Sequence, residues 1–501
     1  MVGCDFGVGQ HTLAPRNPDL SGVTKMLRAF PGRVARRADR TWYVAARLES
    51  LEVIVKRLVR CLAAIGIVSV SGCGASAGEG GSADTQQALT GADVIRVATL
   101  ADQGLAEFQN AYLPGNITND RGIRFGSLGS DVFRAHGDQG NTFWMLTDRG
   151  PNGQPGGRRT FAVPEFAPSI LRVKVRGDAI DVVEVHPVAA LDGTLLRGLP
   201  NLATDEVAFN FDATQPLGIN PNGIDPEAIV RLPAGDFWLV EEYRPSLLHL
   251  DSTGHVLERL VPLNAGLTGT SYPVTEALPE ILKTRRANRG FEGLSLSPDK
   301  TTMVAAMQSP LEHPTRNIGR ASRNLRFLSI DVASRQTTGE FVYQMEEVCS
   351  FLGLTTGCGV APGDMKVSGL AALTNDQILV LERTDDVAKL YLVDLSAATN
   401  ILGSAFDLAA TTPAIEELVD PATAGVLVLP KTLVVDLSTL PGIPKKIEGV
   451  TVINPETLAI SNDNDFGLVD ETTYDAAGNL TNDTGVKSQI RYLRLPAALP
   501  H

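Results

Sequence analysis

Phe291-Glu292-Gly293-Leu294, followed after a short gap by Met303-Val304-Ala305-Ala306-Met307-Gln308, decides the fold because the same pattern recurs along the chain. Later copies are Val367-Ser368-Gly369-Leu370 before Ile378–Arg383, and Ile447-Glu448-Gly449-Val450 before Leu458–Asp463. Earlier copies are Asp225-Pro226-Glu227 before Phe237–Tyr243, and the weaker Gly129-Ser130-Asp131 before Phe143–Arg149. Each copy combines short apolar runs with Gly, Pro, Asn and Asp between them, a pattern typical of antiparallel strands.

This repetition predicts an all-β body over residues 93–497. A small sheet leaves two faces apolar and two edges unpaired, and stacking such sheets around an axis buries the faces and protects the edges. We therefore expect a single β-propeller of five to seven blades, each an antiparallel four-stranded sheet. The stretches 190–223, 262–289 and 401–446 could hold a sixth blade or be long loops. Two separate β-sandwiches are the alternative architecture.

Equivalent positions of the repeats carry acidic side chains, and a propeller would bring them together at its centre. One position is filled by Glu227, Glu292, Ser368 and Glu448, and a second by Asp148, Glu242, Gln308, Glu382 and Asp463. Carboxylates that meet repel one another unless a cation or protons relieve the charge. Calcium fits because it takes six to eight oxygen ligands in flexible geometry. We predict metal ligands at Glu227, Glu292, Glu448, Asp463 and Asp465, the last two from the oxygen-rich stretch Asn462–Gly467.

The stretch Asp148-Arg149-Gly150-Pro151-Asn152-Gly153 predicts a rigid turn that presents a carboxylate and a guanidinium together. Arg158 and Arg159 follow closely, and guanidinium groups suit bidentate capture of phosphate or carboxylate. The alternative interpretation is purely structural: the stretch is an ordinary turn, and each Glu-Gly pair caps a blade by bonding to neighbouring backbone.

Charge and missing motifs exclude several classes of function. The formal net charge is −13, and residues 61–501 alone carry −19, so the body would repel nucleic acid. The chain has no Gly-x-Ser-x-Gly elbow, no histidine-phosphatase motif and no Cys-x5-Arg loop. Its histidines show no metal-ligand spacing.

The N-terminal region reads as an export signal. A basic start at Lys56, an apolar run from Leu62 to Val70 and the ending Ser71-Gly72-Cys73 predict a lipoprotein signal over residues 55–73, with Cys73 as the lipidated residue. Residues 1–54 are interpreted as an extension upstream of the true start, or a basic leader, and 74–92 as a flexible tether. The predicted location is therefore the outer membrane or periplasmic face, with membrane contact only through the lipid. Cys349 and Cys358 are expected to form a disulfide in that oxidising compartment.

The repeated blocks, together with Thr147–Gly153, Asn288–Leu294 and Asn462–Phe466 in this order, resemble the phytase-like family labelled "esterase-like activity of phytase". The resemblance covers about residues 95–496. It implies a secreted, metal-assisted hydrolase of small phosphate or carboxylic esters, with calcium polarising the ester oxygen. Under this hypothesis Asp148, Arg149 and Glu292 are catalytic, with Arg149 holding the developing anion, and Arg158, Arg159, Glu242 and Arg383 bind substrate.

Two other functions remain open from the sequence. One is a non-enzymatic cell-surface propeller that binds a ligand or partner, since propellers serve many functions. The other is a sugar-lactone or phosphodiester hydrolase of the same metal-propeller type. The sequence indicates no oligomeric state.

Overall fold

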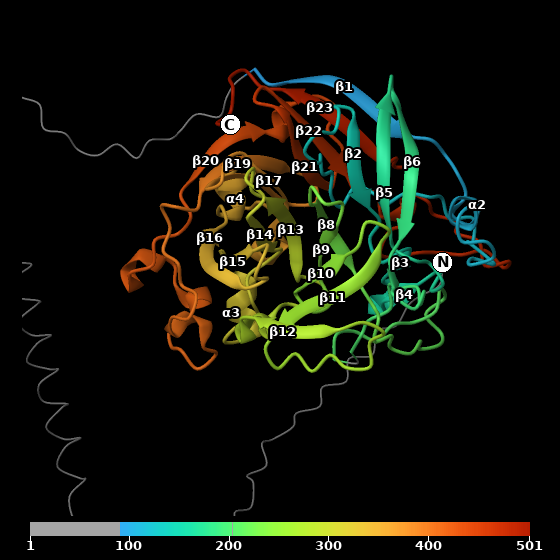
Figure 1. Cartoon of the computed structure of the whole chain (residues 1–501), viewed down its shortest axis with the longest axis horizontal. Helices are drawn as coiled ribbons and strands as arrows, with labels where there is room; N and C mark the ends of the chain where they lie inside the picture. Colours follow the sequence, from blue (N-terminus) through green and yellow to red (C-terminus); the bar gives the residue numbers. More distant parts are fainter. Residues whose placement is uncertain (1–90, 203) are drawn as a thin grey trace, which may run out of the picture. The chain divides into compact units, whose positions relative to one another are not determined.

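The computed structural model describes residues 91–202 and 204–501. They form a β-propeller in which groups of antiparallel strands surround a common centre (Figure 1). The prediction of an all-β propeller is confirmed. The alternative of two separate β-sandwiches does not apply, because the sheets follow one another in a ring. Residues 1–54, the signal at 55–73 with Cys73, and all but the end of the 74–92 tether lie outside the described residues.

Two strand groups open the body. The first contains β2 (Thr142–Leu146), β5 (Ser169–Arg176) and β6 (Ala179–Pro187), with a side hairpin of β3 (Asn152–Gly153) and β4 (Thr160–Phe161). Its innermost segment pairs with β2 through Phe133 and Trp144. The second contains β8 (Pro226–Arg231), β9 (Phe237–Glu241), β10 (Ser246–Leu250) and β11 (His255–Pro262), flanked by β7 (Ala189–Ala190) and β12 (Val274–Leu278).

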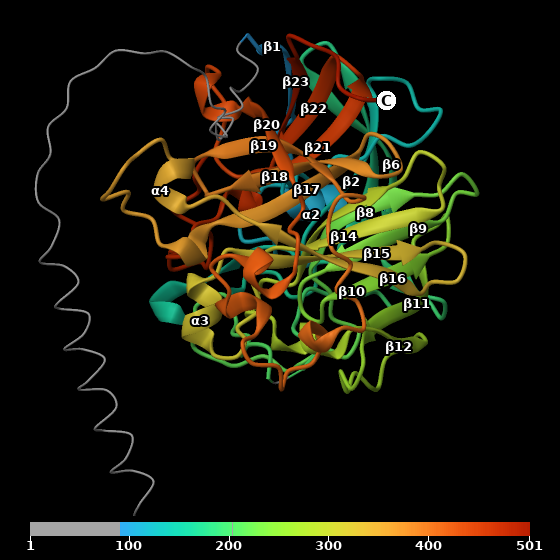
Figure 2. The same cartoon turned by 90° about the vertical axis from the view of Figure 1, so that its left-hand side faces the viewer.

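Two regular four-stranded sheets follow. One contains β13 (Phe291–Leu296), β14 (Thr302–Met307), β15 (Asn324–Asp331) and β16 (Thr337–Gln344). The next contains β17 (Lys366–Ala372), β18 (Gln377–Arg383), β19 (Ala388–Asp394) and β20 (Lys431–Asp436), which lie side by side in Figure 2. The stretch 401–446 thus supplies the outer strand β20 and four short 3-10 helices: η4 (Ala405–Asp407), η5 (Ile415–Glu417), η6 (Pro421–Ala424) and η7 (Leu437–Thr439).

The last group joins the two ends of the body. It contains β21 (Ile447–Asn454), β22 (Thr457–Asn462) and β23 (Gln489–Arg494), and its outer strand is β1 (Asp93–Leu100). β1 pairs antiparallel with β23, with Ala98 opposite Ile490, and both strands lie at the same edge in Figure 1. The N-terminal strand therefore completes the C-terminal sheet and closes the ring.

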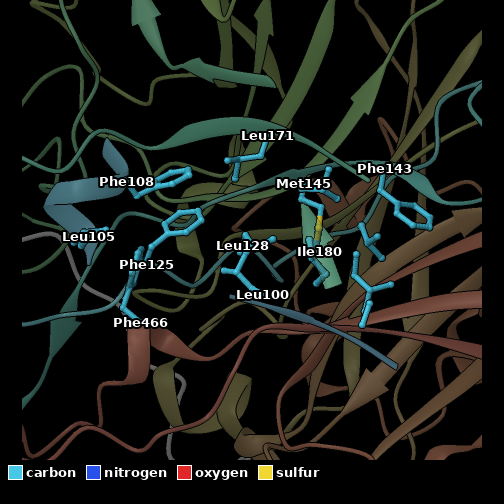
Figure 3. Packing of buried hydrophobic residues seen from close by; sticks show 14 of the residues in the cluster. Leu100, Leu105, Phe108, Phe125, Leu128, Phe143, Met145, Leu171, Ile180 and Phe466 are labelled. Carbon is cyan, nitrogen blue, oxygen red and sulfur yellow. The ribbon is translucent and has the colours of Figure 1, made fainter. Parts of the chain in front are cut away.

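Within residues 91–202 and 204–501, the α-helices are short and lie in the connections: α2 (Leu105–Asn110), α3 (Arg316–Ala321) and α4 (Val348–Phe351). α2 seals one side of the first sheet, where Phe108 stacks on Phe125 with ring centroids 3.4 Å apart (Figure 3). Cys349 of α4 forms a disulfide with Cys358, which confirms the predicted pairing. In the described part of the chain, no helix is long and apolar enough to cross a membrane.

The innermost strands share a β-bulge at the repeated motif. The strand register shifts between Pro226 and Ala228 in β8, Phe291 and Gly293 in β13, Val367 and Leu370 in β17, and Ile447 and Gly449 in β21. The residues inside these bulges are Glu227, Glu292, Ser368 with Gly369, and Glu448. A bulge removes a residue from the regular ladder and redirects its side chain. The repeated motif therefore gives the bulged residue of each inner strand an equivalent position.

The glycines of the motif allow the inner strands to approach closely. A Cβ atom on Gly293 would lie 2.3 Å from the Ser368 carbonyl oxygen of β17, and one on Gly369 would lie 2.6 Å from the Glu448 carbonyl oxygen of β21. A Cβ on Gly449 would lie 2.7 Å from the Val132 backbone nitrogen of the first group. Only glycine permits these backbone contacts, so the repeated glycine fixes the spacing of the ring.

Candidate functional site

A polar cavity of about 1030 Å³ opens at the bulged ends of the inner strands. Its lining includes almost all of the residues selected from the sequence: Asp148, Arg149, Arg159, Glu227, Glu242, Glu292, Arg383, Glu448, Asp463 and Asp465. Two residues of the repeated positions do not line it: Ser368, and Glu382, which instead contacts Tyr343 Oη at 2.6 Å and Lys431 Nζ at 2.9 Å. Arg158 does not line it either. Its guanidinium is directed away, donating to the Ala213 carbonyl at 2.8 Å and lying over the Phe209 ring.

Three carboxylates form the tightest acidic group of the cavity. Asp225 and Glu227 flank Pro226 at the start of β8, and Glu242 follows the end of β9. Each offers an oxygen within 4.8 Å of the others, and we call this set the carboxylate trio. The pairing of β8 with β9 and the bond from the Glu242 N–H to the Asp225 carbonyl (3.1 Å) hold the trio together.

Burial and mutual repulsion perturb the acidity of the trio. Burial, and then the charges of Glu292 and Asp225, raise the pKa of Glu227 and of Glu242 well above the ordinary value. Burial raises the pKa of Asp225 to about 6, against the opposing effect of Arg149. Without a cation, these groups can coexist only by retaining protons.

Several buried oxygen atoms around the trio have no hydrogen-bond donor. They are Glu242 Oε1, Glu292 Oε2, Gln308 Oε1 and Asn288 Oδ1. All four belong to residues that line the cavity. Buried polar atoms are normally paired, and a group of unpaired acceptors with no donor among them is a suitable environment for a hard cation. The residues present therefore fit a divalent metal at the trio, with Glu292 beside it.

Basic side chains already neutralise the other predicted carboxylates. Arg383 is fully buried, donates to Glu448 and to Ser368 Oγ (2.8 Å), and lies 3.6 Å from Glu292 Oε1. Burial still raises the pKa of Glu448 to about 7. Arg383 is predicted to bind substrate, and in the structure its guanidinium contacts other side chains of the protein.

The Asp463–Asp465 segment is held by a lysine. Lys446 contacts Asp465 and keeps the pKa of that carboxyl below its ordinary value despite burial. Asp463 accepts a hydrogen bond from Ser127 Oγ at 2.6 Å, and its pKa is raised by burial and by Asp465. Asp465 and Phe466 both have positive φ, at 47° and 54°. The segment is a tightly turned wall of the cavity beside Asp148.

The charged side chains of the Asp148-Arg149 turn all have hydrogen-bond or ion-pair partners within the protein. Asp148 accepts from the Gly150 N–H at 2.8 Å, and burial and then Asp225 raise its pKa. Arg149 Nη1 lies 2.8 Å from Glu206 and 3.1 Å from Asp225. Arg159 Nη1 donates to Asn152 Oδ1 at 2.8 Å. Arg149 therefore connects the turn to the carboxylate trio.

Sequence reasoning missed three residues of this site. Asp225 was visible two positions before Glu227, but the repeated motif has an acidic residue at only one of these positions. Arg286 and Arg289 precede the motif in β13, and only Lys445, three residues before Glu448, matches Arg289 in charge, so a search for repeated acidic positions could not find them.

A family model described as "Esterase-like activity of phytase" matches residues 123–466, which include the whole cavity apart from a few residues at its C-terminal side. The chain belongs to the phytase-like family. This finding confirms the resemblance inferred from the ordered blocks.

Individual relatives are more distant from this phytase-like protein. An uncharacterized secreted protein from Arthroderma benhamiae is 26% identical over 180 residues, which are 30% of this chain and 35% of that protein. The match thus spans about a third of the relative's length. Among solved structures, a luciferin-regenerating enzyme is 10% identical with a TM-score of 0.31, over 76% of this chain and 81% of that one. A PQQ-bound aldose sugar dehydrogenase from Streptomyces coelicolor is 10% identical with a TM-score of 0.29, over 81% and 98%.

Proposed function

We propose that this phytase-like protein is a metal-assisted hydrolase of phosphate or carboxylic esters. Family membership supports hydrolysis as the general activity. The observation that carries the proposal is the carboxylate trio with its neighbouring buried oxygens that lack donors. A small ester fits a polar cavity of about 1030 Å³.

Asp225, Glu227 and Glu242 would hold the cation, with Glu292 as a further oxygen ligand. Calcium is the proposed ion, because carboxylate and amide oxygens at irregular positions suit its flexible coordination. When bound, a divalent cation polarises an ester oxygen and stabilises negative charge that develops on it.

The remaining side chains have defined tasks in this proposal. Arg149 positions Asp225 through their 3.1 Å contact, and Arg383 keeps Glu292 and Glu448 in place. The pKa of Glu448, about 7, suits it to hold or release a proton near neutral pH. Asp148, whose pKa is also raised, is the second candidate for proton transfer.

Metal dependence is the first test. The purified protein is assayed on p-nitrophenyl phosphate and p-nitrophenyl acetate with and without a chelator. Chelation should abolish turnover, and added calcium should restore it. Glu227→Gln keeps the side-chain shape but removes a charge, and should weaken calcium binding, measured by calorimetry, by roughly tenfold or more.

Glu276→Gln is the matched control, because Glu276 is an exposed residue of β12, on another part of the molecule. It should leave both activity and calcium affinity unchanged. Turnover that persists in chelator, or equal calcium affinity for the Glu227 variant and the control, would contradict the metal proposal.

The proposed site of action is outside the cytoplasm, with the mature chain anchored by lipid on Cys73. Support comes from the Cys349–Cys358 disulfide, which suits an oxidising compartment, and from a relative described as secreted. Metabolic labelling with a radioactive fatty acid, compared between the full-length chain and Cys73→Ser, tests the anchor.

A further inference from the structure

Two arginines of the cavity lack an acidic partner. Arg286 and Arg289 lie in the loop between η2 (Glu280–Thr284) and β13. Arg286 Nη1 donates to the Gly363 carbonyl at 2.6 Å, and Arg289 Nη1 donates to Ser309 Oγ at 3.2 Å. Within residues 91–202 and 204–501, no carboxylate oxygen lies within 4.0 Å of either guanidinium. Both side chains thus retain donors for a ligand.

The other basic residues of the cavity are paired. Their pairs are Arg149 with Glu206 and Asp225, Arg159 with Glu206, Arg316 and Arg320 with Glu312, Lys366 and Arg383 with Asp385, Lys445 with Asp386, and Lys446 with Asp465. Against this pattern, Arg286 and Arg289, which are close enough for the charge of one to act on the other, stand out as the cavity's basic residues without an ion-pair partner among the residues that the structure describes. Burial and the charge of Arg286 lower the pKa of Arg289 to about 10, so Arg289 is charged at neutral pH.

The backbone holds Arg289 next to the carboxylate trio. A Cβ on Gly290 would lie 2.4 Å from the Glu242 carbonyl oxygen, so the turn packs directly on the backbone of that ligand. The Gly290 carbonyl accepts from the Gln308 N–H at 2.8 Å. Asn288, with φ of 53°, makes the tight turn before Arg289. Arg289 is near enough to Glu242 and Glu292 for their charges to affect it.

We propose that Arg286 and Arg289 form an anion-binding subsite that selects the dianionic phosphoryl group of a phosphate monoester over a neutral carboxylic ester. The inference rests on the proposed function, because it places the phosphoryl group between this pair and the cation at the trio. Planar guanidinium groups bind tetrahedral oxyanions through paired N–H donors. A neutral acyl ester presents no charge in its ground state for the pair to bind.

The test compares Arg289→Gln and Arg286→Gln with the wild-type protein. With p-nitrophenyl phosphate, each change should raise KM by about tenfold or more, since each removes a charged hydrogen bond. With p-nitrophenyl acetate, KM should stay within about twofold, because that substrate makes no such bond in its ground state. Arg176→Gln, an exposed arginine at the end of β5, is the control and should change neither.

Binding provides a readout that does not require turnover. Phenylphosphonate, a non-hydrolysable phosphate ester analogue, is titrated by calorimetry into calcium-loaded protein. The affinity for phenylphosphonate should be about tenfold lower in each single variant. Arg289→Lys keeps the charge but loses the planar pair of N–H donors, so its affinity should lie between those of the wild type and Arg289→Gln. Circular dichroism confirms that the variants are folded.

The outcomes separate this inference from the proposed function. If the wild-type protein hydrolyses neither substrate but phenylphosphonate binding depends on the arginines, the hydrolase proposal fails and the subsite stands. If the arginine variants bind phenylphosphonate as tightly as the control, or lose acetate and phosphate turnover equally, the subsite is overturned.

Discussion

Arg383 shows how a single basic residue can hold several acidic and polar groups of the site together. Its guanidinium is buried between the side chains of Ser368, Glu292 and Glu448, which come from three neighbouring inner strands. The family resemblance implies that Arg383 binds substrate. In the structure its guanidinium is the internal counter-ion of two carboxylates that would otherwise repel each other.

Replacing Arg383 should therefore affect stability as well as activity. Arg383→Gln leaves buried acidic groups without their cation, and we expect a loss of about 3–5 kcal/mol in the free energy of unfolding. The exposed Arg176→Gln should cost at most about 1 kcal/mol. Urea denaturation measures both. Equal stability of the two variants, with lost activity in Arg383→Gln alone, would restore the substrate-binding role.

At the scale of residues, the sequence predicted site residues that belong to the repeated motif and missed site residues that lie outside it. Glu227, Glu292 and Glu448 were predictable because one motif places them equivalently. Asp225, Arg286 and Arg289 join the cavity through pairings between particular loops, which leave no periodic signal. Whether Arg158 lies inside the cavity depended on a side-chain direction, which the sequence does not encode.

At the scale of elements, the bulged inner strand is the unit that builds the site. The Glu-Gly pair is interpretable from sequence as a cap, whereas the structure shows a bulge followed by a backbone contact with the next strand. The strands themselves were predictable from apolar alternation and turn residues. The register shift was not, because a bulge changes pairing without changing composition.

Gly293→Ala tests this unit. The new methyl group would lie 2.3 Å from the Ser368 carbonyl oxygen, so β13 and β17 must separate. We expect a destabilisation of about 1–3 kcal/mol. Calcium affinity should fall too, because Glu292 moves with the bulge.

Gly218→Ala is the control, since no atom lies within 4 Å of a Cβ at that exposed position. Its unfolding midpoint in urea should match that of the wild-type protein. If the Gly293 variant matched it as well, close packing of the inner strands would not be what maintains the ring.

At the scale of the whole molecule, closure depends on a strand far away in the sequence. The repeats predict a propeller, but β1 lies before the first repeat and resembles none of them. Its partner β23 is about four hundred residues later, with Asp93 opposite Arg494. Sequence patterns describe local units well and pairing between distant units poorly, so this closure could not be assigned.

A pair of truncations tests the closure. A chain that starts at residue 91 should unfold cooperatively, like the full-length protein. A chain that starts at residue 101 loses the buried side chains of Ala98 and Leu100 and exposes the edge of β23, so its free energy of unfolding should be lower by about 3 kcal/mol or more. Thermal denaturation followed by circular dichroism distinguishes them. Identical curves would show that β1 is dispensable.

Ser368 occupies in β17 the position that carries glutamate in the other bulged strands, yet its strand keeps the same bulge and the same close glycine contact. Scaffold and chemistry are therefore encoded separately at this position: glycine preserves the architecture, while the neighbouring side chain is free to vary. A point mutation at Ser368 can thus exchange a hydroxyl for a carboxylate beside Glu292, and so change the charge around the proposed metal site, without altering the glycine contact that holds the strands together.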